Sequence, residues 1–335
     1  MLTSLKSGYG EKIFIMDFLV NFGGQVGNMI FMLLTGYFLF EKKTSISDTF
    51  KKIKNIGATI LYYSIVIFIV LIPFELSKGH KESSLAKQIS HTNGSFTFDF
   101  FGFNPFQLTD SVWYLRYYVG LLLFILIIGK WLRATDRKKH MILLEILLTL
   151  QILNPPIFQT IGLSIDRNFL TFLLMSLLGG YIRRYNPFEY LSKSSTVIPL
   201  FLSIVVFIIF DFVQRYSVSI DNLYVYNFNS QSNLLTIIIT LLIFILFTKI
   251  HIKNNKLINL VASTTIGIYI LHDGSRQISQ VKYYLIDILF DGNWNLDTLF
   301  YGGFVSIFIW FSAGVLLDLL RQRLFGLTVI RKHLI

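Results

Sequence analysis

The uncharged run Leu234-Leu235-Thr236-Ile237-Ile238-Ile239-Thr240-Leu241-Leu242-Ile243-Phe244-Ile245-Leu246-Phe247 decides the fold class, because it stays mostly apolar over about four turns of a helix. Two further uncharged runs, Ile56–Phe74 and Leu299–Leu317, approach the roughly 20 residues that a membrane span needs. Of the 335 residues 53% are hydrophobic and 15% charged, and the mean hydropathy is +0.60. A soluble domain carries about 25% charged residues. We therefore expect an integral membrane protein with a single membrane domain over residues 1–335.

The remaining apolar segments predict an all-α, polytopic transmembrane helix bundle of about nine spans. The segments of near-span length are 25–40, 56–74, 111–129, 141–158, 167–182, 196–213, 233–252, 257–272 and 299–320. A shorter stretch, Ile278–Phe290, contains Lys282 and Asp287 and predicts one interfacial or re-entrant helix. Asp318 lies near the end of the last span, where we expect water to reach it.

The net charge of +11 would suit a nucleic-acid-binding protein, but the positions of the basic residues indicate another role. About two thirds of the 30 basic residues lie on alternate connections between the predicted spans, which marks that side as cytoplasmic. They are Lys42, Lys43, Lys51, Lys52, Lys54, Lys130, Arg133, Arg137, Lys138, Lys139, Arg183, Arg184, Lys193, Lys249, Lys253, Lys256, Arg321, Arg323, Arg331 and Lys332. The charge therefore predicts a multi-pass protein of the cell membrane, with lipid and not nucleic acid around it, and an amino terminus on the outer side.

The predicted outer loops are rich in aromatic and amide side chains. Glu75–Asp110 is polar first and then aromatic, Gln214–Ser232 is rich in Asn, Ser and Tyr, and Asp273–Asp297 contains Trp294. Such loops suit a carbohydrate, and they equally suit anchoring at the membrane interface. Both interpretations stay open at this point.

Several kinds of chemistry have no signature in the chain. There is no cysteine, and the six histidines are scattered without the spacing of metal ligands. No phosphate-binding glycine loop, dinucleotide fingerprint, zinc-protease motif or nucleophile elbow occurs. We therefore expect no metal site and no bound cofactor.

Five residues are candidates for a functional site. His272 ends a span on the predicted outer side, where a neutral imidazole can take a proton from a hydroxyl, although a histidine at headgroup level is the alternative. Lys51 and Lys54 lie where the second span begins on the cytoplasmic side, and they suit either phosphate binding or orientation alone. Trp113 and Arg116 lie near the outer end of the third span, where Arg116 is functional or extends to the interface.

Four stretches together resemble the acyltransferase-3 family of integral membrane acyltransferases. Asn28-Met29-Ile30-Phe31-Met32-Leu33-Leu34-Thr35-Gly36-Tyr37-Phe38-Leu39 resembles its second span, and Phe50-Lys51-Lys52-Ile53-Lys54 stands where the family has a basic R-x-x-R pair. Ser111-Val112-Trp113-Tyr114-Leu115 resembles a span start, and Thr264-Thr265-Ile266-Gly267-Ile268-Tyr269-Ile270-Leu271-His272 resembles a late segment that ends in His. The stretches occur in family order over most of the chain.

The resemblance implies about ten helices and the transfer of an acyl group, usually acetyl from the co-substrate acetyl-CoA, to a hydroxyl of an extracytoplasmic glycan. By position, Lys51 and Lys54 match the basic pair linked to the acyl donor, and His272 matches the late His. Lys keeps the charge of Arg but lacks its bidentate fork. Trp113 and Arg116 are assigned to the acceptor side or to a structural role.

The chain departs from the family at its beginning. The family's first span carries a basic residue and a histidine regarded as catalytic, and no residue here corresponds to either. We therefore expect that a first span is missing and that transfer by the chain as written is weak or absent. A polytopic glycan flippase or transporter is the alternative function, although no paired repeat supports it, and a glycan polymerase is a third.

Overall fold

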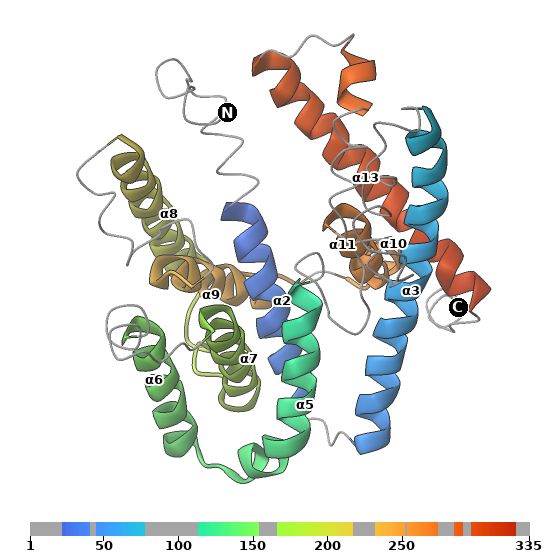
Figure 1. The fold of residues 1–335 in the computed structure, drawn as a ribbon. Coiled ribbons are helices and arrows are strands. Elements are labelled where there is room, and N and C mark those ends of the chain that lie inside the picture. Colours follow the sequence, from blue (N-terminus) through green and yellow to red (C-terminus); the bar gives the residue numbers. More distant parts are fainter. Residues whose placement is uncertain are drawn as a thin grey trace. The chain divides into compact units, whose positions relative to one another are not determined.

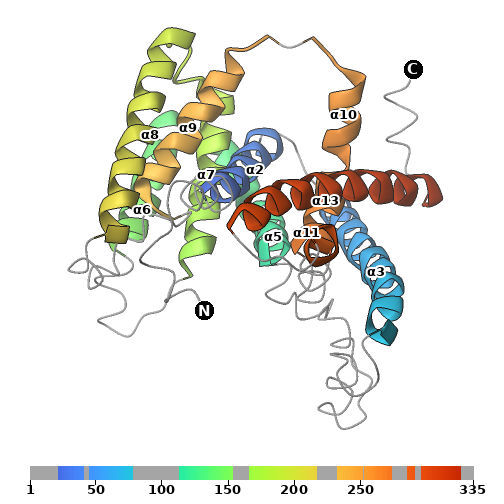
Figure 2. The same ribbon diagram turned by 90° about the horizontal axis from the view of Figure 1, so that it is seen from above.

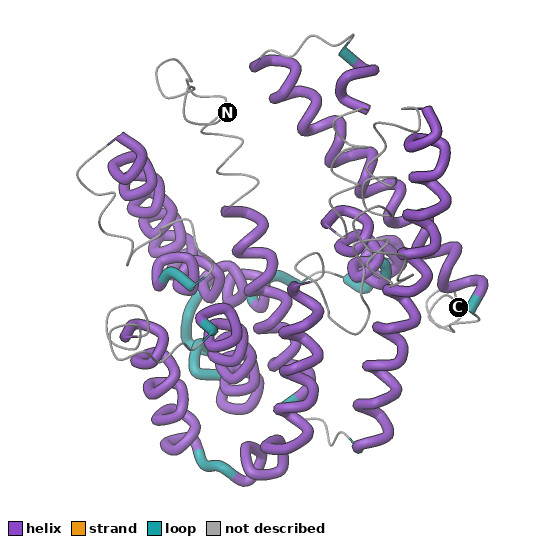
Figure 3. Tube along the Cα trace, viewed as in Figure 1, coloured by secondary structure: helices purple, strands orange, loops and turns teal. Residues whose placement is uncertain are grey.

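The computed structural model describes residues 22–40, 45–77, 113–153, 166–216, 232–251, 253–273, 285–290 and 296–325. Every regular element in these ranges is a helix, so the all-α prediction is confirmed for the part of the chain that is described (Figures 1 and 3). The helices are α2 (Gly23–Leu39), α3 (Ile46–Ser77), α5 (Trp113–Ala134), α6 (Arg137–Leu153), α7 (Arg167–Tyr185), α8 (Lys193–Tyr216), α9 (Leu234–Thr248), α10 (Lys256–Ser263), α11 (Thr265–Asp273) and α13 (Leu296–Leu324).

In the described ranges the predicted spans fall on helices, but the helices differ in whether they are long and apolar enough to cross a membrane. Within the described ranges, Trp113–Ala134, Lys193–Phe210 and Phe300–Leu324 are long and apolar enough by length and composition, and Leu234–Thr248 is apolar but shorter. The count of nine spans therefore stays a prediction. The segment 257–272 was expected as one span and is two helices, α10 and α11, which meet at Thr264.

Two predicted features lie partly or wholly outside the described residues. Of the short stretch Ile278–Phe290, residues 285–289 are helical, and the rest up to 284 is outside the description. The predicted aromatic half of the longest outer loop, within 78–112, is outside it as well.

The chain divides into two compact units. Unit 1 comprises Met1–Thr49 and Tyr117–His251, and unit 2 comprises Phe50–Arg116 and Ile252–Ile335. The helices α3 and α5 each contribute to both units, because a boundary falls within the first turns of each helix. The prediction that the chain functions as a single domain stays a prediction.

In unit 1, α2 and α7 lie side by side (Figure 2). They pack so closely that two glycines at their contact leave no room for a side chain. A Cβ atom on Gly36 of α2 would overlap the backbone oxygen of Ser176, and one on Gly179 of α7 would overlap the backbone oxygen of Leu33. The Ser176 hydroxyl donates to the Met32 carbonyl over 3.1 Å. Small residues allow this approach between apolar helices, where dispersion and hydrogen bonds replace the hydrophobic effect.

The basic ends of three helices meet in unit 1. Arg184, at the end of α7, donates to the carbonyls of Leu132 and Arg133 at the end of α5, over 3.0 and 2.6 Å. Arg137, at the start of α6, donates to the Tyr181 hydroxyl over 3.2 Å. These ends were all predicted to be cytoplasmic, and their sidedness stays a prediction.

The start of α6 is fixed by a carboxylate. Asp136 accepts from the backbone N–H of Lys139 over 2.8 Å and lies 3.4 Å from its ammonium group. The backbone hydrogen bond, and after it the charge of Lys139, hold the pKa of Asp136 below its ordinary value. The negative charge also suits the amino-terminal end of a helix.

We predict that Gly36→Ala destabilises the protein, while Gly27→Ala in the same helix does not. A methyl group at Gly36 forces α2 away from the α7 backbone, at a cost of about 1–3 kcal/mol. A Cβ atom on Gly27 meets no atom within 4 Å, so its expected effect is neutral or a gain of up to about 1 kcal/mol. Thermal unfolding of the purified protein in detergent measures both, and equal melting temperatures for the two variants would contradict the role of Gly36.

Candidate functional site

All five residues predicted for the site belong to unit 2. Lys51 and Lys54 are on α3, Trp113 and Arg116 are in the first turn of α5, and His272 is on the last turn of α11. These positions come from three segments that are far apart in the sequence, so one compact unit contains every candidate.

The two lysines share one face at the beginning of α3. The helix starts with a reciprocal cap: the Asp48 N–H donates to the Ser45 hydroxyl over 3.0 Å, and the Ser45 N–H donates to the Asp48 carboxylate over 3.4 Å. Lys51 and Lys54 follow at a spacing of three, which places them on neighbouring positions of the helix surface. Both are exposed, so both ammonium groups can reach an anionic ligand.

The first turn of α5 contacts α11 one turn before His272. The backbone N–H of Tyr114 donates to the Tyr269 hydroxyl over 3.3 Å, and the two rings pack edge to face with centroids 5.7 Å apart. The Trp113 ring packs on Tyr114, with a centroid separation of 6.2 Å. Because Tyr269 and His272 are three residues apart on α11, this contact brings the Trp113 end of α5 close to the last turn of α11.

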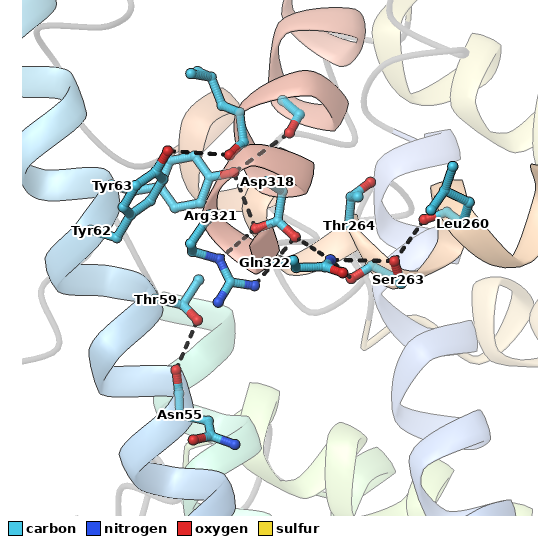
Figure 4. Close-up of polar contacts among 12 residues, drawn as sticks. Asn55, Thr59, Tyr62, Tyr63, Leu260, Ser263, Thr264, Asp318, Arg321 and Gln322 are labelled. Atoms are coloured by element: carbon cyan, nitrogen blue, oxygen red, sulfur yellow. Dashed lines mark hydrogen bonds and ion pairs between the residues drawn. The ribbon is translucent and has the colours of Figure 1, made fainter. Parts of the chain in front are cut away.

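A buried polar cluster in unit 2 was missed by the sequence analysis (Figure 4). At its centre Asp318 on α13 is only 1% exposed, which corrects the expectation that water reaches it. Its carboxylate accepts from the Arg321 Nε over 2.8 Å, from the Gln322 Nε2 over 2.8 Å and from the Tyr63 hydroxyl of α3 over 3.2 Å. A carboxylate this deep requires such donors, because an unpaired buried charge is strongly unfavourable.

Glycines bring α11 and α13 together around this cluster. A Cβ atom on Gly267 of α11 would overlap the Tyr63 hydroxyl and the Asp318 carboxylate, and one on Gly314 of α13 would lie 2.9 Å from the Ile268 Cα. The neighbouring Tyr62 hydroxyl donates to the Leu317 carbonyl over 3.2 Å. The contacts of the cluster therefore hold α3, α11 and α13 together around Asp318.

The helices of the cluster are also those of the predicted site residues. Along α3, Tyr62 follows Lys54 by eight residues, or about 12 Å. Along α11, His272 follows Gly267 by five residues, or about 7.5 Å. The sequence signal for the cluster was the spacing of Asp318, Arg321 and Gln322, which places an ion pair and an amide on one face of the last helix.

Among the residues that the structure describes, no group of three or more His, Asp and Glu side chains is arranged to hold a metal ion. The site consists of a pair of exposed cations, an exposed imidazole and a buried ionic cluster. Such a set can bind an anion and transfer protons.

Comparison with known families decides the kind of protein. The acyltransferase-3 family model, described as an acyltransferase domain, matches residues 3–317. The chain belongs to this family. The family prediction is thereby confirmed, and family and apolar helices together indicate a membrane acyltransferase. No curated protein and no solved structure matches the chain.

The family match does not include the three cluster residues at the end of α13. It ends at residue 317, so Asp318, Arg321 and Gln322 lie just beyond the matched residues. The predicted missing first span, and the roles of the five site residues, stay predictions.

We predict that Arg321→Met destabilises the protein by about 3–5 kcal/mol, because it leaves the buried Asp318 carboxylate without its cation. Arg323→Met is the matched control, since Arg323 is exposed on the same helix and should change stability little. Adding Asp318→Asn to the Arg321→Met variant should recover most of the loss. Thermal unfolding in detergent provides the measurement, and similar melting temperatures for Arg321→Met and Arg323→Met would show that the ion pair is not structural.

Proposed function

We propose that this acyltransferase moves an acyl group, in the first instance acetyl, from cytoplasmic acyl-CoA to a hydroxyl of an extracytoplasmic glycan. The proposal rests on one observation: α3, which carries Lys51 and Lys54, approaches α11, which carries His272, at the Tyr63–Gly267 contact within one compact unit. A donor-binding group and a proton-accepting group on packed helices are what transfer through a membrane bundle needs.

On the donor side, the exposed lysine pair supplies charge for the phosphates of CoA. Two ammonium groups on one helix face can each donate a charge-assisted hydrogen bond, and their place on the predicted cytoplasmic side is where CoA is found. Lys binds phosphate as a point charge, so this contact gives affinity more than orientation.

On the acceptor side, His272 is assigned the role of general base. Its imidazole takes the proton of a glycan hydroxyl, and the hydroxyl oxygen attacks the carbonyl carbon of the acyl thioester. The C–S bond breaks, an ester C–O bond forms, and the CoA thiolate leaves and takes up a proton. The ring of Trp113, packed on Tyr114 near α11, provides an apolar face on which a sugar can lie.

The alternative, a glycan flippase or transporter, predicts a different observable. A transporter moves its substrate without turnover of acyl-CoA. The family match favours the acyltransferase.

The donor proposal is tested on membranes that contain the full chain. We expect acetyl-CoA to protect Lys51 and Lys54 from an amine-labelling reagent, and the double variant Lys51→Gln/Lys54→Gln to weaken the apparent affinity for acetyl-CoA about tenfold or more. Lys52→Gln removes the same charge from the same turn but from another face, so it controls for topology. Equal effects of the double variant and Lys52→Gln, or no protection by acetyl-CoA, would contradict the donor site.

The acceptor proposal is tested by transfer of label from radioactive acetyl-CoA to envelope glycan. His272→Gln should lower the kcat that the chain as written retains by about 10²–10⁴-fold with the donor affinity unchanged, because a general base contributes in this range. His251→Gln, an exposed histidine of unit 1, should leave transfer as it is. Equal transfer by His272→Gln and His251→Gln would contradict the role of His272, and glycan flux without acyl turnover would favour the transporter.

A further inference from the structure

The expected span 257–272 is interrupted at a run of three hydroxyl residues. The hydroxyl of each of these residues, Ser263, Thr264 and Thr265, donates to the backbone carbonyl three positions earlier, over 2.7 Å in every case. At Thr264 the backbone has φ −96° and ψ 1°, and its N–H bonds the Val261 carbonyl over 3.0 Å in a tightened turn. Hydroxyls that bond back in this way bend or end helices.

The side chain of Gln322 binds the carbonyl at this break. In a continuous helix the Ser263 carbonyl would accept from the N–H of residue 267. Here the Gln322 Nε2 donates to that carbonyl over 3.2 Å and lies 3.3 Å from the Ser263 hydroxyl (Figure 4). Gln322 is 2% exposed, so water does not replace this contact easily.

Asp318 in turn orients the amide of Gln322. The Asp318 Oδ2 accepts from the Gln322 Nε2 over 2.8 Å and from the Arg321 Nη2 over 3.3 Å, while the Arg321 Nε and the Tyr63 hydroxyl donate to Oδ1. The chain of contacts therefore runs from α3 through α13 to the break between α10 and α11.

The amide oxygen of Gln322 is buried and has no hydrogen-bond partner among the described residues. A Gln whose acceptor is left unsatisfied contributes through its NH₂ group alone. An apolar side chain of the same size would avoid the unsatisfied oxygen, so stability by itself does not explain the amide at this position.

We infer that Gln322, oriented by Asp318, is a positioning residue that fixes the start of α11 and thereby the place of His272 at its end. The functional half of this inference rests on the proposed function of His272. Its structural half, that Gln322 fixes the start of α11, does not depend on that function. With Gly267 pressed against the cluster, α11 has little freedom to slide, and the amide holds the carbonyl from which the helix departs. A shift of about 1 Å at a reacting group lowers a rate about a hundredfold.

The structural half is tested by hydrogen exchange of the full chain in detergent or nanodiscs. Gln322→Met should speed exchange of the α11 amides about tenfold, the factor expected from losing one to two hydrogen bonds. Gln151→Met is the matched control, because Gln151 of unit 1 is also buried, also donates to a serine carbonyl (Ser232, 3.2 Å) and also has an unsatisfied oxygen. It should leave exchange in α11 unchanged.

The functional half is tested by the kinetics of acetyl transfer. Gln322→Met should lower kcat about ten- to a hundredfold without weakening donor binding, and should have no further effect when His272 is already Gln. Ser263→Ala removes the hydroxyl, with its contacts to Gln322 and to the Leu260 carbonyl, and keeps the Ser263 carbonyl. It should change exchange and kcat in the same direction by a smaller factor, and it serves as the probe where Gln322→Met does not fold.

The outcomes separate the two ideas. Unchanged exchange in α11 with Gln322→Met, or an equal change with Gln151→Met, overturns the positioning role. Full activity of His272→Gln together with faster exchange in Gln322→Met overturns the role of His272 but leaves the contact between Gln322 and the break in place.

Discussion

The burial of one carboxylate, Asp318, is the constraint on which the arrangement of unit 2 depends. A charge within apolar helices is stable only where cations and hydrogen-bond donors surround it. Arg321, through two of its nitrogens, and Gln322 on the same helix donate to the carboxylate, and so does Tyr63 from α3. The partner from α3 is 255 positions away in the sequence, so stabilising the buried charge requires a contact between α3 and α13.

The close approach of helices follows from the same chemistry. The polar groups of the cluster reach one another only if the backbones of α11 and α13 nearly touch, and Gly267 and Gly314 permit this. In unit 1 the contact of α2 and α7 uses glycine in the same way, but there the Ser176 hydroxyl bonds a backbone carbonyl, and the exposed Arg183 donates to the Tyr37 hydroxyl near the helix ends. Glycine thus serves apolar packing in one unit and the satisfaction of a buried ion in the other.

Hydropathy predicted the helical class and the approximate positions of the helices, because long uncharged runs require backbone hydrogen bonds within the segment. The family was predicted separately, from four stretches that resemble its motifs. Hydropathy failed at Thr264, since an average over a window of about 20 residues hides three consecutive hydroxyls. It also failed at Asp318, which looked like a residue at the edge of a span. Burial there depends on Tyr63, a tertiary contact that no local pattern encodes. The proximity of Trp113 to the end of α11, through Tyr114 and Tyr269, was likewise not visible in the sequence.

The polar cluster is better explained by the orientation that it gives to its neighbours than by its contribution to the free energy of folding. A buried ion pair and its amide contribute little net free energy compared with apolar side chains of the same volume, and the unsatisfied oxygen of Gln322 costs about 1–3 kcal/mol. What polar groups provide, and apolar groups do not, is direction: the Gln322 amide meets the Ser263 carbonyl at a defined distance and orientation. Where the hydrogen-bond ladder between two consecutive helices is interrupted, the backbone does not fix the angle between them. The first N–H groups of the second helix then have no carbonyl partner within that helix. A side chain from a neighbouring helix must then set that angle, and Gln322 is placed to do so.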